Sequence, residues 1–107
     1  MSAATWAEGR QLSLLPDPLE ARFLAYHHAN PHVYRELVAM ARQWRAAGHT
    51  HAGIAMFFEV LRWQSGLRGD GDQFALNNSY RSRYARLIAA NEPDLTDLFT
   101  MRHLAGE

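Results

Sequence analysis

Cysteine is absent from the 107 residues, and all eleven basic residues are arginine because the chain has no lysine. The absence of cysteine excludes disulfides, thiolate metal sites and a cysteine nucleophile, and it fits a reducing cytoplasm. No apolar run approaches the roughly 18 residues of a membrane span. The first residues also lack the basic start and apolar stretch of a secretory signal. We therefore expect a cytoplasmic protein without a membrane partner.

The chain also lacks a net charge, because eleven acidic residues balance the eleven arginines. The two signs are unevenly placed. Residues 1–20 hold one arginine and three acids, residues 21–91 hold nine and four, and residues 92–107 hold one and four, which gives −2, +5 and −3. Zero net charge argues against a strongly basic nucleic-acid binder, but it leaves a basic middle region.

Length and hydrophobic periodicity predict an all-α, or mainly α, protein with one core. We expect a flexible N-terminal arm over residues 1–16 and a single helical domain over residues 17–104, folded as a compact bundle of four to five short helices. The predicted helices cover residues 17–28, 31–47, 50–64 and 78–91, followed by a short helix from residue 93. Residues 65–72 are predicted to form a loop. Over residues 73–77 the large apolar side chains fall at every second position, as in a short β segment.

The third predicted helix, over residues 50–64, is apolar nearly all round. Its apolar side chains are Ile54, Met56, Phe57, Phe58, Val60, Leu61 and Trp63. Only Glu59 and Arg62 form a narrow polar strip. A helix of this kind lies centrally in a core or contributes to an oligomer interface. We therefore expect it to be the core helix, and we count a homodimer among the possible assemblies.

A basic segment at the start of the fourth predicted helix is the most suggestive constellation. No acidic residue occurs between Gln73 and Asn91. With Tyr80 and Tyr84 turned inward, the outward polar side chains are Asn77, Asn78, Ser79, Arg81, Ser82, Arg83 and Arg86. These residue types donate hydrogen bonds to phosphates and base edges, and a helix N-terminus adds backbone amides. A solvated helix face without a ligand is the simpler alternative.

The leading hypothesis is therefore a small accessory or regulatory protein that binds DNA through this helix, with Arg42 and Arg45 extending the basic surface. The third and fourth predicted helices would form a unit that only resembles a helix-turn-helix, because more than ten residues separate them where a turn of three to four residues is usual. The hypothesis requires the arginines to converge on one water-facing patch after folding.

Six histidines raise the alternative of a metal protein: His27, His28, His32, His49, His51 and His103. His28 and His32 have helical spacing, but the corner at Asn30-Pro31 separates them, and the sequence offers no third ligand and no HExxH motif. We therefore expect no metal and no cofactor. The sequence also lacks GxSxG, a phosphate-binding glycine loop and paired carboxylates in an apolar setting, so an enzyme is less favoured and we name no catalytic residue.

Three segments carry a resemblance to a known family: YHHANPHVY at 26–34, GIAMFFEVLRW at 53–63 and FALNNSYRSRYAR at 74–86. They resemble small phage and prophage proteins of actinobacteria, over about residues 20–103. The resemblance implies a phage setting and the host cytoplasm, and it transfers no activity. With this setting, the leading hypothesis is a phage- or prophage-encoded DNA-binding protein. The second hypothesis is a protein-interaction module that inhibits or modulates a host protein. Neutral charge, acidic ends and the apolar third helix support this alternative.

Overall fold

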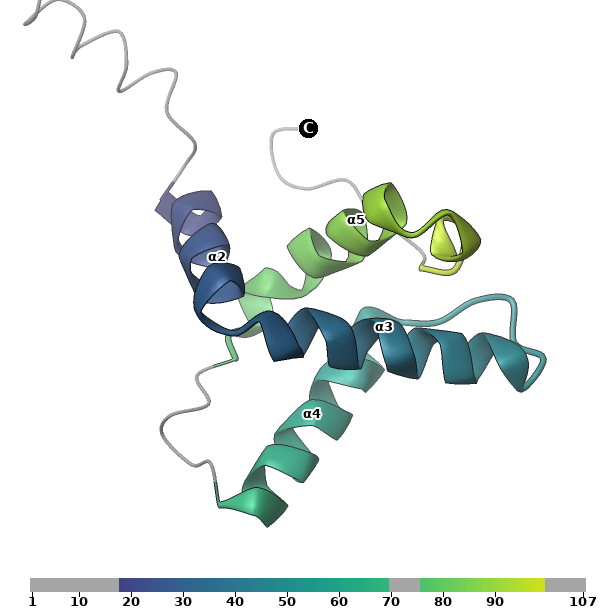
Figure 1. The fold of residues 1–107 in the computed structure, drawn as a ribbon, viewed down its shortest axis with the longest axis horizontal. Coiled ribbons are helices and arrows are strands. Elements are labelled where there is room, and N and C mark those ends of the chain that lie inside the picture. Colours follow the sequence, from purple (N-terminus) through teal and green to yellow (C-terminus); the bar gives the residue numbers. More distant parts are fainter. Residues whose placement is uncertain (1–17, 70–75, 100–107) are drawn as a thin grey trace, which may run out of the picture.

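The computed structural model describes residues 18–69 and 76–99, which form four α-helices and two short 3-10 helices (Figure 1). They are α2 (Pro18–Ala29), α3 (Pro31–Ala46), α4 (Ile54–Arg68), η2 (Asn78–Tyr80), α5 (Arg81–Asn91) and η3 (Pro93–Leu95). These residues contain no strand, so the all-α prediction is confirmed. The predicted arm at 1–16 and residues 100–104 of the predicted domain lie outside the described residues. So do residues 73–75 of the predicted β segment.

The corner between α2 and α3 is built by Asn30, as the sequence predicts. Its backbone N–H and its side-chain Nδ2 both donate to the carbonyl of Tyr26, at 2.8 and 3.0 Å, and so close the end of α2. The Asn30 carbonyl accepts from the Val33 N–H at 3.0 Å and starts α3. The Asn30 side chain makes no capping hydrogen bond to α3, because it bonds back to α2.

α4 starts and ends four residues later than predicted. It starts late because the Ala52 N–H donates to the Leu98 carbonyl at 2.9 Å, and Ala52 forms an isolated parallel bridge with Phe99. These contacts hold the preceding segment extended. The helix then continues through residues 65–68, which were predicted as loop, and ends where Gly69 adopts a left-handed conformation with φ 78°. Glycine adopts this conformation without steric cost.

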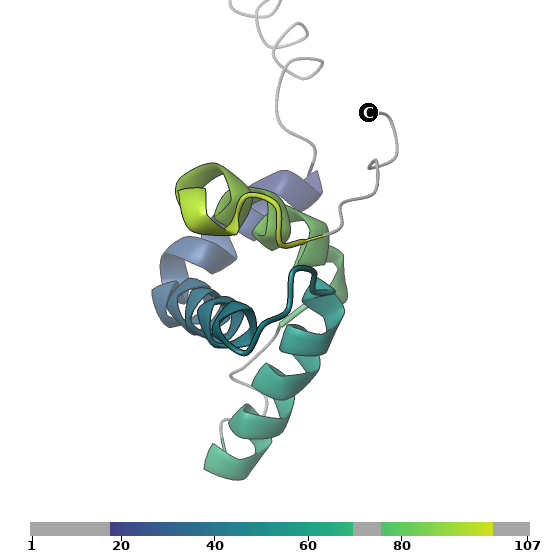
Figure 2. The ribbon, with the colours of Figure 1, turned by 90° about the vertical axis from the view of Figure 1, so that its right-hand side faces the viewer.

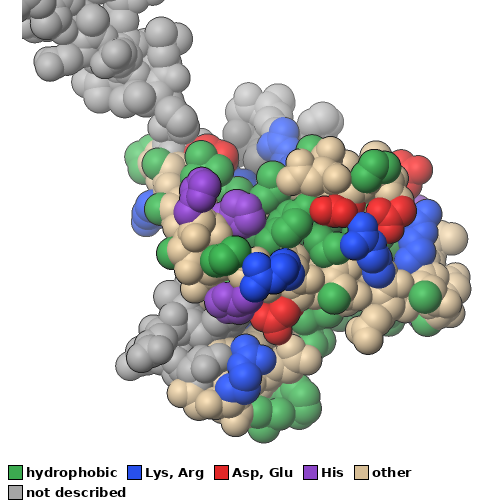
Figure 3. All heavy atoms as spheres, viewed as in Figure 1, with side chains coloured by type: hydrophobic (Ala, Val, Ile, Leu, Met, Phe, Trp, Pro, Cys, Tyr) green, Lys and Arg blue, Asp and Glu red, His purple; other side chains and the backbone are tan. Residues whose placement is uncertain are grey.

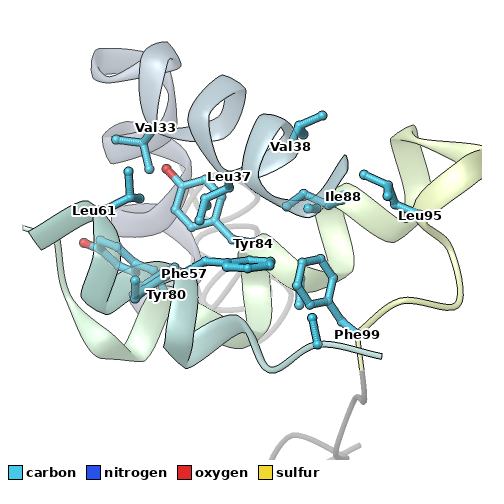
Figure 4. Packing of buried hydrophobic residues seen from close by; sticks show 14 of the residues in the cluster. Val33, Leu37, Val38, Phe57, Leu61, Tyr80, Tyr84, Ile88, Leu95 and Phe99 are labelled. Atoms are coloured by element: carbon cyan, nitrogen blue, oxygen red, sulfur yellow. The ribbon is translucent and has the colours of Figure 1, made fainter. Parts of the chain in front are cut away.

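The core is formed where α3, α4 and α5 pack on one another (Figures 2 and 4). Tyr84 of α5 lies at its centre, in edge-to-face contact with Phe58 of α4 and Phe23 of α2. The largest fully buried side chains are Tyr84, Phe58, Leu37, Leu61, Ile88, Leu95, Leu98 and Val33. Each described α-helix therefore buries one apolar face, and α4 is the helix that keeps a second apolar face outside this core.

Candidate interaction surface

α4 carries apolar side chains on two opposite sides. On the inner side, Phe57, Phe58 and Leu61 are buried in the core. On the outer side, four apolar residues are exposed: Met56 by 38%, Val60 by 37%, Trp63 by 65% and Leu67 by 69%. Their spacing of four, three and four residues places them on one helix face. We call these four residues the outer stripe. Figure 3 shows hydrophobic side chains at the lower end of the molecule, where α4 lies in Figure 1.

A groove of about 290 Å³ lies beside the first half of the outer stripe. It is bounded by the C-terminal part of α3, the following turn and the start of α4, and its lining residues are Met40, Gln43, Trp44, Ala47, His49, Met56, Phe57 and Val60. Met56 and Val60 belong to both the groove and the stripe. The lining is mostly apolar, as in surfaces that receive apolar side chains of a ligand or partner.

Local contacts hold the α3 wall of the groove in place. The Trp44 Nε1–H donates to the His51 carbonyl at 2.8 Å, which fixes the orientation of the indole. The His49 ring stacks on it with a centroid distance of 3.7 Å and an interplanar angle of 12°. Gly48, with φ 103°, makes the turn that places His49 there. Because these contacts already exist in the free chain, the groove needs little reorganisation to accept a side chain.

Arg42, predicted to extend a basic surface, lies in an ion-pair cluster. Its Nη2 donates to Glu92 Oε1 at 2.7 Å and its Nε to Asp94 Oδ2 at 3.0 Å. Glu92 also accepts from the Tyr34 hydroxyl at 2.7 Å. Hydrogen bonds from the Arg42 guanidinium lower the pKa of Asp94, and both carboxylates raise the pKa of Arg42. The cluster joins α3 to η3, and Arg45 is exposed one turn further along α3.

Arg83, predicted to contact nucleic acid, also bonds within the protein. Its Nε donates to Glu20 Oε1 at 2.9 Å, and only 14% of its side chain is exposed. This ion pair joins α5 to α2. Farther along α5, Arg86 is exposed, and Ser82 is half-buried on the preceding turn.

The polar residues at the start of the fourth helix do lie together, and they bond to one another. Asn77 Oδ1 accepts from the backbone N–H and the hydroxyl of Ser79, at 2.9 and 2.6 Å. Arg81 Nε donates to the Asn78 carbonyl at 3.1 Å. Arg62 of α4 donates to Asn78 Oδ1 and to the Leu76 carbonyl. These residues therefore lie near one another, and much of their bonding capacity is used within the fold.

Figure 3 shows arginines and acidic side chains interleaved on the face it presents. The described ion pairs bring together residues from different elements, as in Arg42 with Asp94 and Arg83 with Glu20. These long-range pairs are the part of the surface that sequence reasoning missed. Because they set positive charge beside negative charge, they weaken the potential that attracts a polyanion.

The histidine nearest the core is His27, which packs between rings. Its ring stacks on Phe23 with a centroid distance of 6.1 Å and also lies against Tyr34 and Tyr84. Burial, with the nearby charge of His28, lowers the pKa of His27. Within residues 18–69 and 76–99, no three histidine or carboxylate side chains gather as a metal site would require, and His103 lies outside these ranges.

Three polar atoms of this region are buried without a protein partner in the described part of the chain: Tyr26 Oη, His27 Nδ1 and Tyr84 Oη. Burial raises the pKa of Tyr26 to about 12 and raises the pKa of Tyr84 as well. The hydroxyls therefore stay protonated at neutral pH, and they contribute polarity to the core without charge.

Comparison with protein family models, with curated proteins and with solved structures finds no match. Among the described residues, no helix combines the length and the hydrophobicity needed to cross a membrane. The exposure of the outer stripe and the apolar lining of the adjacent groove make them the strongest candidate site among the described residues.

Proposed function

We propose that this chain is a protein-interaction module that binds a partner protein through the outer stripe and the groove. The observation that carries the proposal is the exposure of Trp63 and Leu67 on a helix whose opposite face already packs in the core. Burying apolar surface contributes about 25 cal/mol per Å². Tryptophan is also among the residues that dominate binding energy at protein interfaces. A partner that covers these side chains therefore gains a large part of its affinity from them.

The charge around the outer stripe also suits a protein partner. The four stripe residues are uncharged, and the polar residues beside them are Glu59, Arg62, Gln64 and Arg68. Arg68 Nη1 lies 3.8 Å from Glu36 Oε1 of α3. Arg62 Nη1 and Glu59 Oε2 are 2.6 Å apart and neutralise each other. An apolar centre with few charges and a polar rim is the usual composition of a protein interface. DNA, in contrast, requires an excess of free cations.

The two functions named from the sequence thus differ in what supports them. A nucleic-acid-binding function needs Arg42 and Arg83 available for phosphate, and both make ion pairs with carboxylates of other elements. An interaction module needs an accessible apolar surface, and α4 supplies one.

Site-specific photo-cross-linking tests the proposal. A photoreactive amino acid replaces Leu67 in the full chain, and irradiation of the cells that express it is expected to yield a protein adduct of higher mass. The matched control carries the same amino acid at Leu24, which is 40% exposed on α2 and outside the stripe. Adducts confined to position 67, and lost on Trp63→Glu, support the proposal. No protein adduct at position 67, or equal adducts at both positions, contradicts it.

A further inference from the structure

We infer that the partner seated on the outer stripe is a second copy of this chain, with the two α4 helices packed antiparallel about a twofold axis. The inference rests on the proposed function and names its partner. Three observations carry it: the spacing of the stripe, the different relief of its two halves, and the charges on its flanks.

The spacing of the outer stripe is the same in both directions along the helix. Its residues are numbered 56, 60, 63 and 67, so a twofold axis between residues 61 and 62 exchanges 56 with 67 and 60 with 63. In the antiparallel pair, Met56 faces Leu67 of the second copy, and Val60 faces Trp63 of the second copy. The steps of four and three are those of a coiled-coil seam. A twofold interface requires such a self-complementary surface.

The two halves of the stripe differ in exposure, and the twofold axis brings the more exposed half of one copy onto the less exposed half of the other. Met56 and Val60 are the less exposed pair, and both line the groove beside α3. Trp63 and Leu67 are the more exposed pair, on the half of α4 that does not line the groove. The twofold axis places the projecting half of one copy on the recessed half of the other. The largest stripe side chain, Trp63, then meets the smallest, Val60.

The charges beside the stripe allow this pairing. An antiparallel twofold axis brings the same flank of each helix together, so the flank with Glu59 and Arg62 faces its own copy. These two residues have opposite charges and already pair within each chain. The axis sets Arg62 beside Arg62 of the second copy, but each Arg62 is neutralised by Glu59 of its own chain at 2.6 Å and also donates to the Leu76 carbonyl, so this flank adds no uncompensated charge to the seam. The other flank presents the neutral Gln64 and, one turn further on, Arg68, whose Nη1 lies 3.8 Å from Glu36 Oε1 of the same chain.

The size of the surface predicts a reversible dimer. Stable complexes cover about 800 Å² on each partner. Four partly exposed side chains supply less than this, and the α3 wall of the groove adds to them. We therefore expect a dissociation constant in the micromolar range, with monomers at high dilution.

Sedimentation equilibrium of the full chain tests the association. The mass is expected to rise with concentration from 12.2 kDa towards twice that value. Trp63→Glu is expected to remain monomeric, and Leu24→Glu to associate as the unaltered chain does. Circular dichroism checks that both variants stay helical. Should Trp63→Glu lose its helical signal, Leu67→Glu replaces it. A monomer at all concentrations, or a dimer that Trp63→Glu and Leu67→Glu leave intact, overturns the inference.

Cysteine cross-linking tests the orientation, because the chain has no cysteine of its own. A mixture of Met56→Cys and Leu67→Cys chains is expected to give mixed dimers with a short bismaleimide. Each variant alone is expected to give little, since residues 56 of the two copies lie about 16 Å apart along the axis at 1.5 Å per residue. Cross-links between two Met56→Cys chains or between two Leu67→Cys chains, without any cross-link between a Met56→Cys chain and a Leu67→Cys chain, would show a parallel pair and overturn the inference.

The two tests separate this inference from the proposed function. If the purified chain is monomeric and position 67 still cross-links to a different protein in cells, the second copy is wrong and the interaction module stands. If the chain is monomeric and position 67 cross-links to no protein, both are wrong. If the chain dimerises as described, the adduct at position 67 has the mass of two chains.

Discussion

The arginine-bearing surface and the outer face of α4 differ in what folding leaves available. Arg42, Arg62 and Arg83 each bond to carboxylates or carbonyls of the same chain. The outer stripe has no comparable cover among the described residues, since Trp63 and Leu67 remain mostly exposed. A group that is exposed and unsatisfied is a better indicator of a binding site than a group that is merely abundant in the sequence. Four experiments either break this contrast or sharpen it.

The largest expected effect separates the two faces of α4. Phe58→Ala removes a fully buried ring that packs on Tyr84 and should lower the free energy of unfolding by about 3–5 kcal/mol. Leu67→Ala should change it by less than about 0.5 kcal/mol, because the side chain is mostly solvated. Urea denaturation of the dilute monomer measures both. Similar losses at the two positions would contradict the division into a core face and an exposed face.

The next largest effect concerns binding. Trp63→Ala should weaken association by about 2 kcal/mol or more, or roughly 30-fold in the dissociation constant, because a buried tryptophan at an interface is typically worth that much. The free energy of unfolding of the monomer should stay nearly constant. Leu24→Ala is the matched control and should leave association unchanged. Equal affinities for all three chains would show that the stripe does not bind.

A smaller effect tests the arginine surface. Arg83→Ala removes the ion pair with Glu20 and should lower the free energy of unfolding by about 1 kcal/mol, since the pair is partly screened by solvent. In a gel-shift assay at moderate salt, the chain should not shift the mobility of duplex DNA, and the double variant Arg83→Ala with Arg86→Ala should give the same DNA mobility. Salt-sensitive retention that this double variant abolishes would favour nucleic-acid binding over the module.

The smallest effect is a pH dependence. The pKa of His27 in the folded chain lies below the usual 6.5, so the unfolded chain binds the proton more readily. Stability should therefore fall as the pH drops below about 6.5, and His27→Gln should reduce this slope. The lowered pKa of Asp94 has the same sign but acts nearer its usual 3.8. Denaturation between pH 7 and pH 5 isolates His27, and an unchanged slope in His27→Gln would contradict its burial.

The starts of α2, α3 and the turn before α5 could be predicted from sequence because they depend on neighbouring residues. Pro18 and Pro31 each open a helix, and Asn77 caps the turn before α5 through Ser79. The bounds of α4 could not be predicted, because a contact with Leu98, far along the chain, delays its start. At its other end, Gly66 stays helical and Gly69 takes the left-handed conformation.

The candidate site was predictable only in part. The all-round apolar character of the third helix led us to expect the core helix, with an oligomer interface as the alternative, and assigning Leu67 to a loop hid the regular spacing of the stripe. Whether arginines are free depends on contacts across the fold. Arg42 and Asp94 are 52 residues apart in the chain, and Arg83 and Glu20 are 63 apart. No local pattern contains that information.

Residue-level hydroxyl-radical footprinting of the full chain in the cells that express it tests most directly whether a protein covers the outer face of α4. Leu24 and Leu67 have the same side chain and differ in exposure, at 40% and 69% in the isolated chain. If a partner occupies the stripe, oxidation of Leu67 falls below that of Leu24, and Leu67 regains reactivity in the Trp63→Glu chain. If Leu67 is oxidised more than Leu24 in the unaltered chain, as expected from their exposure in the isolated chain, no partner covers the surface and the proposed function is wrong.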